Sequence, residues 1–374
     1  MHIASIAMAK KNTDIECLRA VAIILTVLQH LYILLRWNPH PFGAAENYLQ
    51  FWGGVDLFFC ISGFVVSKSV MDSIDLARTE GRQWFVVKAF WVRRVYRLLP
   101  SAWLWAFVMA HFGSLHDVAA PTVAIMASVA NFAQYFGINM GGTTVYWSLS
   151  LEEQFYLLFP FFVIFVPVAW RYKVLLIAIA LQFPMRREMG SIFWLTRLDS
   201  MMWGVVIYLF SRTPTYRVFE PQSLKTRTKA WGVSLFFVFL LIAVPGALDV
   251  VRFHVGLMAA VSAALVYIAS FNRSYVFPSR ALRPIMVWIG SRSYAIYLCH
   301  LPAYVITHEY WSRAALRTGL TFPNGTYTLR YIVTALALIA LFAELNYRLI
   351  EVPLRNRGSA AARRIISVPE SATA

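Results

Sequence analysis

Long apolar runs separated by short polar or basic segments recur along nearly the whole chain. Most of them approach the roughly 20 residues that an α-helix needs to cross the hydrocarbon core of a bilayer. The segments that we expect to cross are residues 15–35, 51–70, 98–112, 149–168, 174–184, 198–210, 231–244, 254–271, 284–307 and 329–350. The pattern predicts an all-α integral membrane protein, a polytopic bundle of about ten transmembrane helices.

One further apolar piece, residues 119–136, leaves the topology open, and the basic residues decide between the two arrangements. If this piece does not cross fully, the basic segments all fall on one side of the membrane, and an excess of Lys and Arg marks the cytoplasmic side. These segments are Lys10–Lys11, residues 78–97, Arg171 with Lys173, and residues 212–229, 273–283 and 355–364. We therefore expect both termini to be cytoplasmic. Residues 119–136 would be re-entrant or buried against other helices, where protein covers the backbone.

Composition supports a single membrane domain. Hydrophobic residues make up 59% of the 374 residues, and no stretch resembles an appended soluble domain. We expect one domain over residues 1–357 and a disordered cytoplasmic tail over residues 358–374. The net charge of +16 would suggest nucleic acid in a soluble protein. Here the basic residues lie between the spans, so cytoplasmic-side bias explains them and we expect no nucleic-acid partner.

The cysteines and the first apolar run add little chemistry. Cys17, Cys60 and Cys299 are odd in number and lie within apolar segments, so neither a disulfide framework nor metal-ligand spacing is present. We expect no metal site. The first run follows Lys10 and Lys11 but lacks a small-residue cleavage pattern, which favours a retained signal anchor over a cleaved signal peptide.

The first predicted span carries the most informative pair of polar residues, Arg19 and His30. Their separation of eleven positions is about three helical turns, so both side chains fall on one face, roughly 16 Å apart along the axis. An ionisable residue on such a helix usually faces a protein interior or a wet cavity. We interpret His30 as a general base and Arg19 as an anchor for an anionic ligand. The alternative for His30 is a packing histidine that is hydrogen-bonded to a neighbouring helix.

A basic cluster, Arg93, Arg94 and Arg97, precedes the third predicted span. Such charges can be purely topogenic. The alternative is phosphate binding, because arginine forks match phosphate oxygens in bidentate geometry. Several arginines together would then indicate a multiply phosphorylated ligand.

Three carboxylates are further candidates. Asp56 follows two glycines at the start of the second span, where negative charge favours a helix N-terminus. Its functional alternative is to orient His30 or to bind a substrate hydroxyl. Glu152 and Glu153 open an apolar helix on the outer side and project about 100° apart, so at least one should turn inward. There, Glu152 could bind substrate hydroxyls and Glu153 could adjust the base.

Two other polar residues could bind substrate. Ser62 precedes Gly63, and the commoner role of such a pair is close helix packing. Ser62 could instead hold an oxyanion. His300 is a second histidine candidate, on a helix that Pro302 should break locally.

Several enzyme and transporter signatures are absent from the sequence. It has no Gly-rich nucleotide loop, no metal-ligand cluster and no G-x-S-x-G elbow. A transporter or flippase of a polysaccharide or lipid-linked sugar would also have many spans and buried polar groups. Inverted repeats with paired broken helices would favour that function, and no convincing internal repeat is visible.

Taken in order, these motifs resemble those of the type 3 membrane acyltransferases, bacterial integral-membrane enzymes that O-acylate surface polysaccharides, lipopolysaccharide and related glycans. The matching pieces are residues 16–20 with His30, 54–64, 93–100, 147–156, 197–199, 293–300 and 351–355. They cover nearly the full length. The family often begins this series with Asp-Gly-Leu-Arg, whereas this chain has Glu16-Cys17-Leu18-Arg19, which keeps the spacing from Arg to His.

The resemblance implies a membrane acyltransferase domain over residues 1–357 in the bacterial inner membrane. It implies an acyl-CoA donor, commonly acetyl-CoA, on the cytoplasmic side and a glycan hydroxyl acceptor on the other. The family's Arg-to-His motif maps onto Arg19 and His30, and its basic motif onto Arg93, Arg94 and Arg97. Direct transfer with His30 as base and an acyl-histidine intermediate both stay open.

Specificity for the acceptor would reside in the outer loops, chiefly residues 37–50 and 309–328. Their aromatic side chains could stack on sugar rings, and an aromatic belt at the membrane interface is the alternative.

Overall fold

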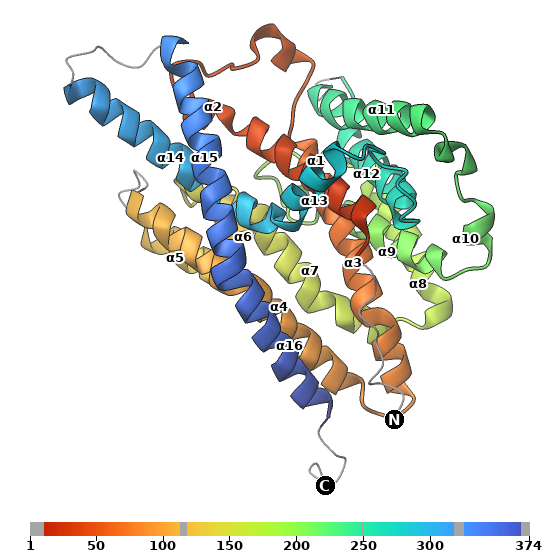
Figure 1. Ribbon diagram of the computed structural model, residues 1–374. Coiled ribbons are helices and arrows are strands. Elements are labelled where there is room, and N and C mark those ends of the chain that lie inside the picture. The colour runs from red at the N-terminus through yellow and green to blue at the C-terminus, as the bar shows by residue number, and fades with distance from the viewer. Residues whose placement is uncertain (1–10, 113–117, 248–249, 318–324, 368–374) are drawn as a thin grey trace.

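The computed structural model describes residues 11–112, 118–247, 250–317 and 325–367, and these residues form helices and loops without a β-strand. The fold class predicted from the sequence, all-α, is therefore confirmed for this part of the chain. The helices pack into one elongated bundle, with α4, α15 and α16 forming one long flank and α8 to α12 the other (Figure 1).

The helices follow the predicted spans closely in position but not always in length. Their bounds are α1 Thr13–Gln29, α2 Leu31–Leu34, α3 Gly53–Arg78, α4 Gln83–Phe112, α5 Ala119–Met126, α6 Ala130–Tyr135, α7 Tyr146–Phe165, α8 Val168–Gln182, α9 Asp199–Ser211, α10 Thr215–Val218, α11 Arg227–Gly246, α12 His254–Ser270, α13 Leu282–Ser291, α14 Ser293–Arg317, α15 Thr328–Asn346 and α16 Val352–Ile366.

Five helical stretches are long and apolar enough to cross a membrane. They are Gly53–Arg78, Tyr146–Phe165, Ile192–Ser211, Arg227–Gly246 and Thr328–Ile366, and His254–Ser270 is a shorter apolar helix. The chain is thus a multi-pass membrane protein, and the predicted count of ten spans stays a prediction.

The ambiguous apolar piece does not form a single helix. It divides into α5, of eight residues, and α6, of six. Each is well short of the roughly 20 residues that cross a bilayer. The piece lies against α4 and α7, in keeping with the expectation that other helices cover it.

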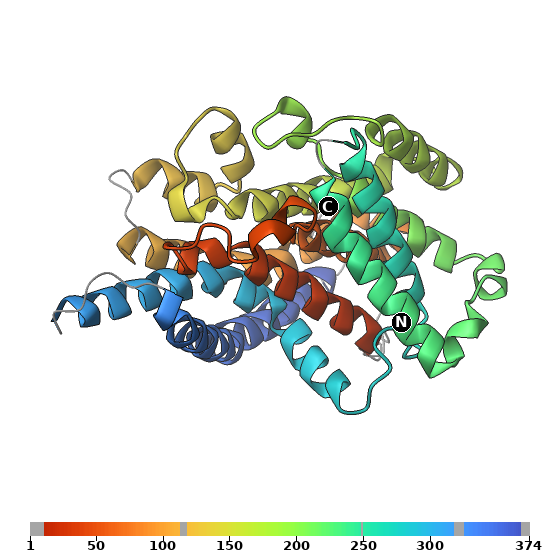
Figure 2. The same cartoon turned by 90° about the horizontal axis from the view of Figure 1, so that it is seen from above.

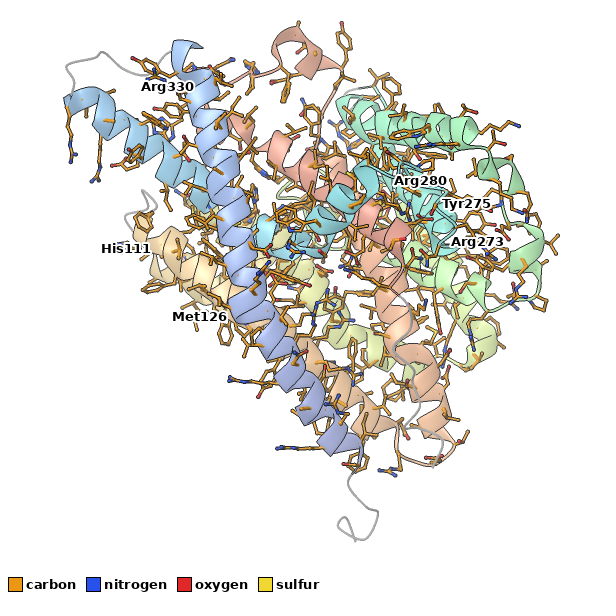
Figure 3. The ribbon with its side chains drawn as sticks, viewed as in Figure 1. His111, Met126, Arg273, Tyr275, Arg280 and Arg330 are labelled. Carbon is orange, nitrogen blue, oxygen red and sulfur yellow. The ribbon has the colours of Figure 1, made fainter. Side chains whose placement is uncertain are left out.

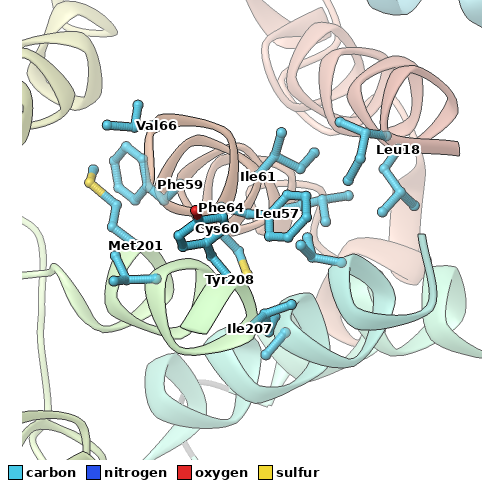
Figure 4. Close-up of a cluster of buried hydrophobic side chains, with 14 of the residues drawn as sticks. Leu18, Leu57, Phe59, Cys60, Ile61, Phe64, Val66, Met201, Ile207 and Tyr208 are labelled. Atoms are coloured by element: carbon cyan, nitrogen blue, oxygen red, sulfur yellow. The ribbon is translucent and has the colours of Figure 1, made fainter. Parts of the chain in front are cut away.

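Helix α3 is the centre of the core. It packs against α1, α7, α9 and α12, and its apolar face interlocks with side chains of α9 (Figure 4). The approach of α3 to α9 depends on glycine, because a Cβ on Gly63 would overlap the carbonyl oxygen of Met201 and one on Gly204 would overlap that of Cys60. Small residues allow backbones to approach this closely between membrane helices.

Ion pairs join segments that the charge pattern places on the same side of the membrane. Arg171 of α8 makes a bidentate pair with Asp75 of α3, and Arg212 after α9 lies 3.2 Å from Asp72. Arg82 between α3 and α4 donates a hydrogen bond of 2.8 Å to the carbonyl of Ile366 at the end of α16.

Segments that the charge pattern assigns to opposite sides of the membrane also lie apart in one view of the bundle. In Figure 3, Arg273 and Arg280 lie on one side of the view, and His111 and Arg330 lie on the other. The predicted topology assigns Arg273 and Arg280 to a cytoplasmic segment and His111 and Arg330 to the outer side, and this sidedness stays a prediction.

The C-terminal boundary differs from the expectation. A π-helical turn, Tyr347–Glu351, joins α15 to α16, and α16 continues to Ile366 against α4. Residues 358–366 are therefore helical rather than part of a disordered tail, because α16 has α4 to pack on. Residues 368–374 lie outside the described residues.

Seen from above, α1 crosses the middle of the bundle (Figure 2). It ends at Gln29, and His30 separates it from the short helix α2. The predicted first span, residues 15–35, is thus broken at the residue that carries its most reactive side chain.

Candidate active site

Two adjoining cavities lie within the bundle. The larger, with a volume of about 570 Å³, contains His30 in its wall, and we name it the chamber. The smaller, of about 80 Å³, contains Arg19, and we name it the arginine pocket. Val55 of α3 and Tyr297 of α14 line both cavities, so these two side chains stand where the cavities meet.

The arginine pocket gathers charged side chains from three helices. Arg19 comes from α1, Arg94 and Arg97 come from α4, and Glu152 comes from α7. Because α4 begins at Gln83, Arg94 and Arg97 lie several turns into that helix and not at its N-terminus. Arg93 projects elsewhere and is absent from the described lining of the pocket.

Glu152 is the carboxylate that turns inward, and its hydrogen-bond partners are side chains beside the arginine pocket. One of its oxygens accepts hydrogen bonds from the hydroxyls of Ser62 and Tyr156. The guanidinium of Arg94 lies 4.8 Å from the ring centroid of Tyr156. Ser62 and Glu152, two of the predicted substrate-binding residues, therefore lie beside the arginines and away from the chamber.

The arginines of this pocket lack direct partners of opposite charge. No ion pair within 4.0 Å joins Arg19, Arg94 or Arg97 to a carboxylate in the part of the chain that the structure describes. The Nε of Arg19 is buried and has no hydrogen-bond partner. Such a site can receive an anionic group, because guanidinium N–H donors left unpaired in a buried place favour a charged acceptor.

His30 lies at the end of α1, half-buried in the chamber wall, and contacts a second histidine. Its Nδ1 is 2.8 Å from the carbonyl oxygen of Thr26 and 3.2 Å from Nε2 of His300. The Nδ1 of His300 is in turn 2.7 Å from the carbonyl oxygen of Tyr297. His300 is fully buried. The sequence suggests His300 as a substrate ligand, whereas the structure places it behind His30.

These distances fix the tautomers. A carbonyl oxygen only accepts hydrogen bonds, so Nδ1 of both His30 and His300 carries the hydrogen in the neutral rings. The Nε2 of His300 then has a lone pair and can share the single Nδ1 hydrogen of His30 with the nearer carbonyl of Thr26. The Nε2 of His30 keeps its own lone pair for a proton or a reacting carbon.

The structure does not support Asp56 as the partner of His30. Asp56 is fully buried and forms an ion pair with Arg197, and Ser200 donates a hydrogen bond of 3.0 Å to it. With both oxygens engaged by Arg197, just before α9, and one of them also by Ser200 of α9, the carboxylate holds Arg197 at the chamber wall. Asp199, the carboxylate nearest to Arg197 along the chain, binds Arg187 instead.

Glu153 is placed away from both cavities. It is not among the described residues that line either one, and its Oε1 is buried without a hydrogen-bond partner. Adjacent helical positions point about 100° apart, so only one of the two glutamates can face the arginines. The proposed contact of Glu153 with His30 is therefore not present.

The chamber wall also contains residues that no sequence motif marks as site residues. They include Arg186, Arg187 and Glu188 between α8 and α9, and three tryptophans, Trp52, Trp147 and Trp194. The sequence does contain a feature that could mark two of them as functional. Arg186 and Arg187 lie on the predicted outer side, where basic residues are disfavoured.

Residues 37–50, expected to contribute to acceptor specificity, are absent from the described lining of the chamber. Gln50 and Phe51 lie beside Gln29 of α1, and the backbone N–H of Phe51 donates a hydrogen bond of 2.8 Å to Gln29. The described part of residues 309–328 does not line the chamber, and residues 318–324 lie outside the described residues.

Comparison with known proteins shows a similarity to acyltransferases. Residues 12–344 match the acyltransferase domain family. The chain is 26% identical over 393 residues to the peptidoglycan O-acetyltransferase OatA of Listeria monocytogenes, covering 92% of this chain and 56% of that protein. It is 26% identical over 374 residues to the O-acetyltransferase OatA of Staphylococcus aureus, covering 92% of this chain and 57% of that one. The chain thus spans a little over half the length of these relatives. No solved structure matches it.

Proposed function

This chain belongs to the acyltransferase family, and from that premise we propose that it transfers an acetyl group from cytoplasmic acetyl-CoA to a glycan hydroxyl across the bacterial inner membrane. The observation that carries the proposal is the adjacency of two unlike cavities. A pocket rich in unpaired arginines meets, at Val55 and Tyr297, a larger chamber with a histidine lone pair in its wall.

The arginine pocket suits the phosphorylated end of coenzyme A. Arg19, Arg94 and Arg97 offer fork-shaped donors from two helices, the geometry that binds phosphate oxygens. From there the narrow pantetheine arm would pass Val55 and Tyr297 and present its thioester to His30. The topogenic alternative does not account for arginines that lie inside the bundle.

His30 would act as the general base. Its Nε2 would take the proton of the acceptor hydroxyl while that oxygen attacks the thioester carbonyl, and would return the proton to the departing sulfur. The acetyl–sulfur bond breaks as the acetyl–oxygen bond forms, so the products are an O-acetyl sugar and coenzyme A. Base catalysis of this kind is typically worth about 10²–10⁴-fold.

His300 would support this step through His30. By accepting from Nδ1 it keeps the lone pair of His30 on Nε2, and it faces the positive charge that develops on the ring. His300 is thus proposed as a positioning residue. Attack by Nε2 of His30 on the thioester, giving an acyl-histidine, is the rival route and uses the same tautomer.

Release of coenzyme A tests the function. Purified protein in proteoliposomes would be given acetyl-CoA and a bacterial glycan extract, with free thiol and glycan mass followed together. The wild type should release coenzyme A and add 42 Da per acetyl group (an acetyl for a hydrogen); the His30→Ala variant should do neither, a loss of about 10²-fold or more.

A matched control separates chemistry from folding. His40 lies in an exposed loop and pairs with Glu46, so His40→Ala should retain transfer. Both variants should insert in the membrane to the same level. Unchanged transfer by His30→Ala would remove this histidine from the reaction, and a burst of acetyl-protein before any acceptor is added would favour the acyl-histidine route.

A further inference from the structure

The ionised residues that line the chamber are matched one to one. Arg186 pairs with Glu188 at 2.6 Å, and Arg187 makes a bidentate pair with Asp199 at 2.7 and 2.8 Å. The remaining cation, Arg197, forms the buried pair with Asp56.

The chamber therefore has no surplus charge among the residues that the structure describes there. His30 and His254 are its other titratable lining groups apart from the tyrosines Tyr32 and Tyr297, and each has Nδ1 on a backbone carbonyl, at 2.8 and 2.9 Å. The neutral ring satisfies that contact.

The arginine pocket has the opposite character. Three arginines line it, Arg19, Arg94 and Arg97, against the single carboxylate of Glu152. If all four are ionised, the described lining keeps two positive charges in excess. The two cavities thus differ in net charge although they meet at Val55 and Tyr297.

The rest of the chamber wall suits a sugar ring. Its surface is mainly apolar, and Trp52, Trp147 and Trp194 contribute to it. The ring centroids of Trp147 and Trp194 lie 4.2 Å apart. The guanidinium of Arg197 lies 5.0 Å from the ring centroid of Trp52. These contacts cover much of the indole faces, so the tryptophans offer the chamber mainly apolar edges. Such edges can contact the apolar side of a sugar ring, and the side chain of Gln29 in the same lining can reach hydroxyls.

We infer that the part of the acceptor that enters the chamber is an uncharged, hydroxyl-bearing sugar ring, and that rings carrying a carboxylate or phosphate are rejected. A charge brought into a mostly apolar space without a free counter-charge loses its hydration uncompensated. It could displace Asp199 from Arg187 or Asp56 from Arg197 only by stranding a buried carboxylate. The Nε of Arg187 is buried without a partner, but its charge is already matched by Asp199, and a neutral hydroxyl can accept from this N–H. Arg186 is held 2.6 Å from Glu188. The matched charges of the chamber would therefore exclude anions, whereas the excess positive charge of the arginine pocket would attract them.

This inference rests on the proposed function, and pairs of sugars that differ only in charge test it separately. The pairs are the methyl glycosides of glucose, galactose and mannose, each with its uronate. For each, binding to the purified protein and acetyl transfer from acetyl-CoA would be measured. We expect binding and transfer to favour the neutral member by about tenfold or more in at least one pair.

A variant that leaves one arginine of the chamber without its carboxylate partner makes the test more specific. Glu188→Gln leaves Arg186 unpaired at the chamber wall, and both side chains are exposed, so the fold should persist. This variant should shift the preference toward the uronate. The control is Glu309→Gln, which breaks a similar exposed ion pair with Arg313 on α14 and should leave the preference unchanged.

The outcomes are distinct. An equal or greater preference for the uronate in wild type, or the absence of binding by every neutral sugar, overturns the inference. Binding of neutral sugars with no acetyl transfer to any of them would uphold the inference and refute the proposed function.

Discussion

The reactive end of the site is a pair of histidines on two helices, each anchored to a carbonyl of its own helix. The carbonyl of Thr26 and the Nε2 of His300 together favour the tautomer of His30 with its hydrogen on Nδ1. The orientation of the ring therefore does not depend on a carboxylate. This differs from sites in which an aspartate holds the base. It also leaves the buried carboxylate of Asp56 free to pair with Arg197.

Substitution of His300 tests the role assigned to that residue. His300→Leu removes the acceptor opposite Nδ1 of His30 and should lower kcat about 10–100-fold, with little change in KM for acetyl-CoA. His300→Gln can place an amide oxygen where Nε2 lies and should recover most of kcat. Equal losses in the two variants, or a change confined to KM, would mean that His300 does not act through His30.

The arginines can be separated by their position on α4. Arg94→Gln or Arg97→Gln should weaken acetyl-CoA binding about tenfold or more, because each removes charge-assisted hydrogen bonds to phosphate. Arg93→Gln is the matched control on the same helix and should have little effect, since Arg93 does not line the pocket. Calorimetric titration of the purified variants with acetyl-CoA measures this, and an equal loss in all three would indicate a diffuse charge effect.

For single residues, the sequence predicts which side chains belong to the site better than it predicts their interaction partners. Spacing alone places Arg19 and His30 on one face of a helix, and each lines one of two adjoining cavities. Asp56, in contrast, has a partner 141 positions away, Arg197, which no local pattern specifies. Glu152 and Glu153 could be separated only when the neighbours of α7 were known.

Among the helices, α3 and α9 approach each other closely, and the site depends on this contact. Gly63 and Gly204 let the two backbones meet, and this contact positions Asp56 next to Arg197. The packing role assigned to Gly63 from sequence is consistent with this geometry. The length of α4 is less predictable, because its first turns carry charges that a membrane helix usually lacks and are covered by α16.

Gly63→Ala should therefore destabilise the protein. The added methyl group overlaps the Met201 carbonyl, and overpacking of this kind costs about 1–3 kcal/mol. Gly232→Ala on α11 is the control, because its Cβ would meet no atom within 4 Å. Thermal unfolding in detergent should show a lower Tm for the first variant only; equal Tm values would show that the α3–α9 contact is looser than described.

For the molecule as a whole, the charge pattern predicts which segments share a side, and ion pairs such as Arg171–Asp75 join several of them. The sequence cannot give the fold of residues 119–136, since an apolar run has the same composition whether it crosses or folds back. It also cannot give the cavities, which arise from side chains of helices far apart in the chain.

Sidedness can be measured with introduced cysteines. The native Cys17, Cys60 and Cys299 are all buried and should not react with a membrane-impermeant maleimide. Asn139→Cys should be labelled from outside intact cells, and Arg217→Cys only after the membrane is opened. Labelling of Arg217→Cys in intact cells would break the predicted topology.

The central claim is that a donor held by the arginine pocket delivers its acyl group to His30. The most direct measurement is an experimental structure of the protein with an acetyl-CoA analogue whose thioester sulfur is replaced to prevent transfer. We predict phosphates beside Arg94 and Arg97, the pantetheine arm between Val55 and Tyr297, and the acetyl carbonyl within about 3–3.5 Å of the acceptor position next to Nε2 of His30. Phosphates bound in the chamber, or an acetyl group that stops short of Tyr297, would contradict the account.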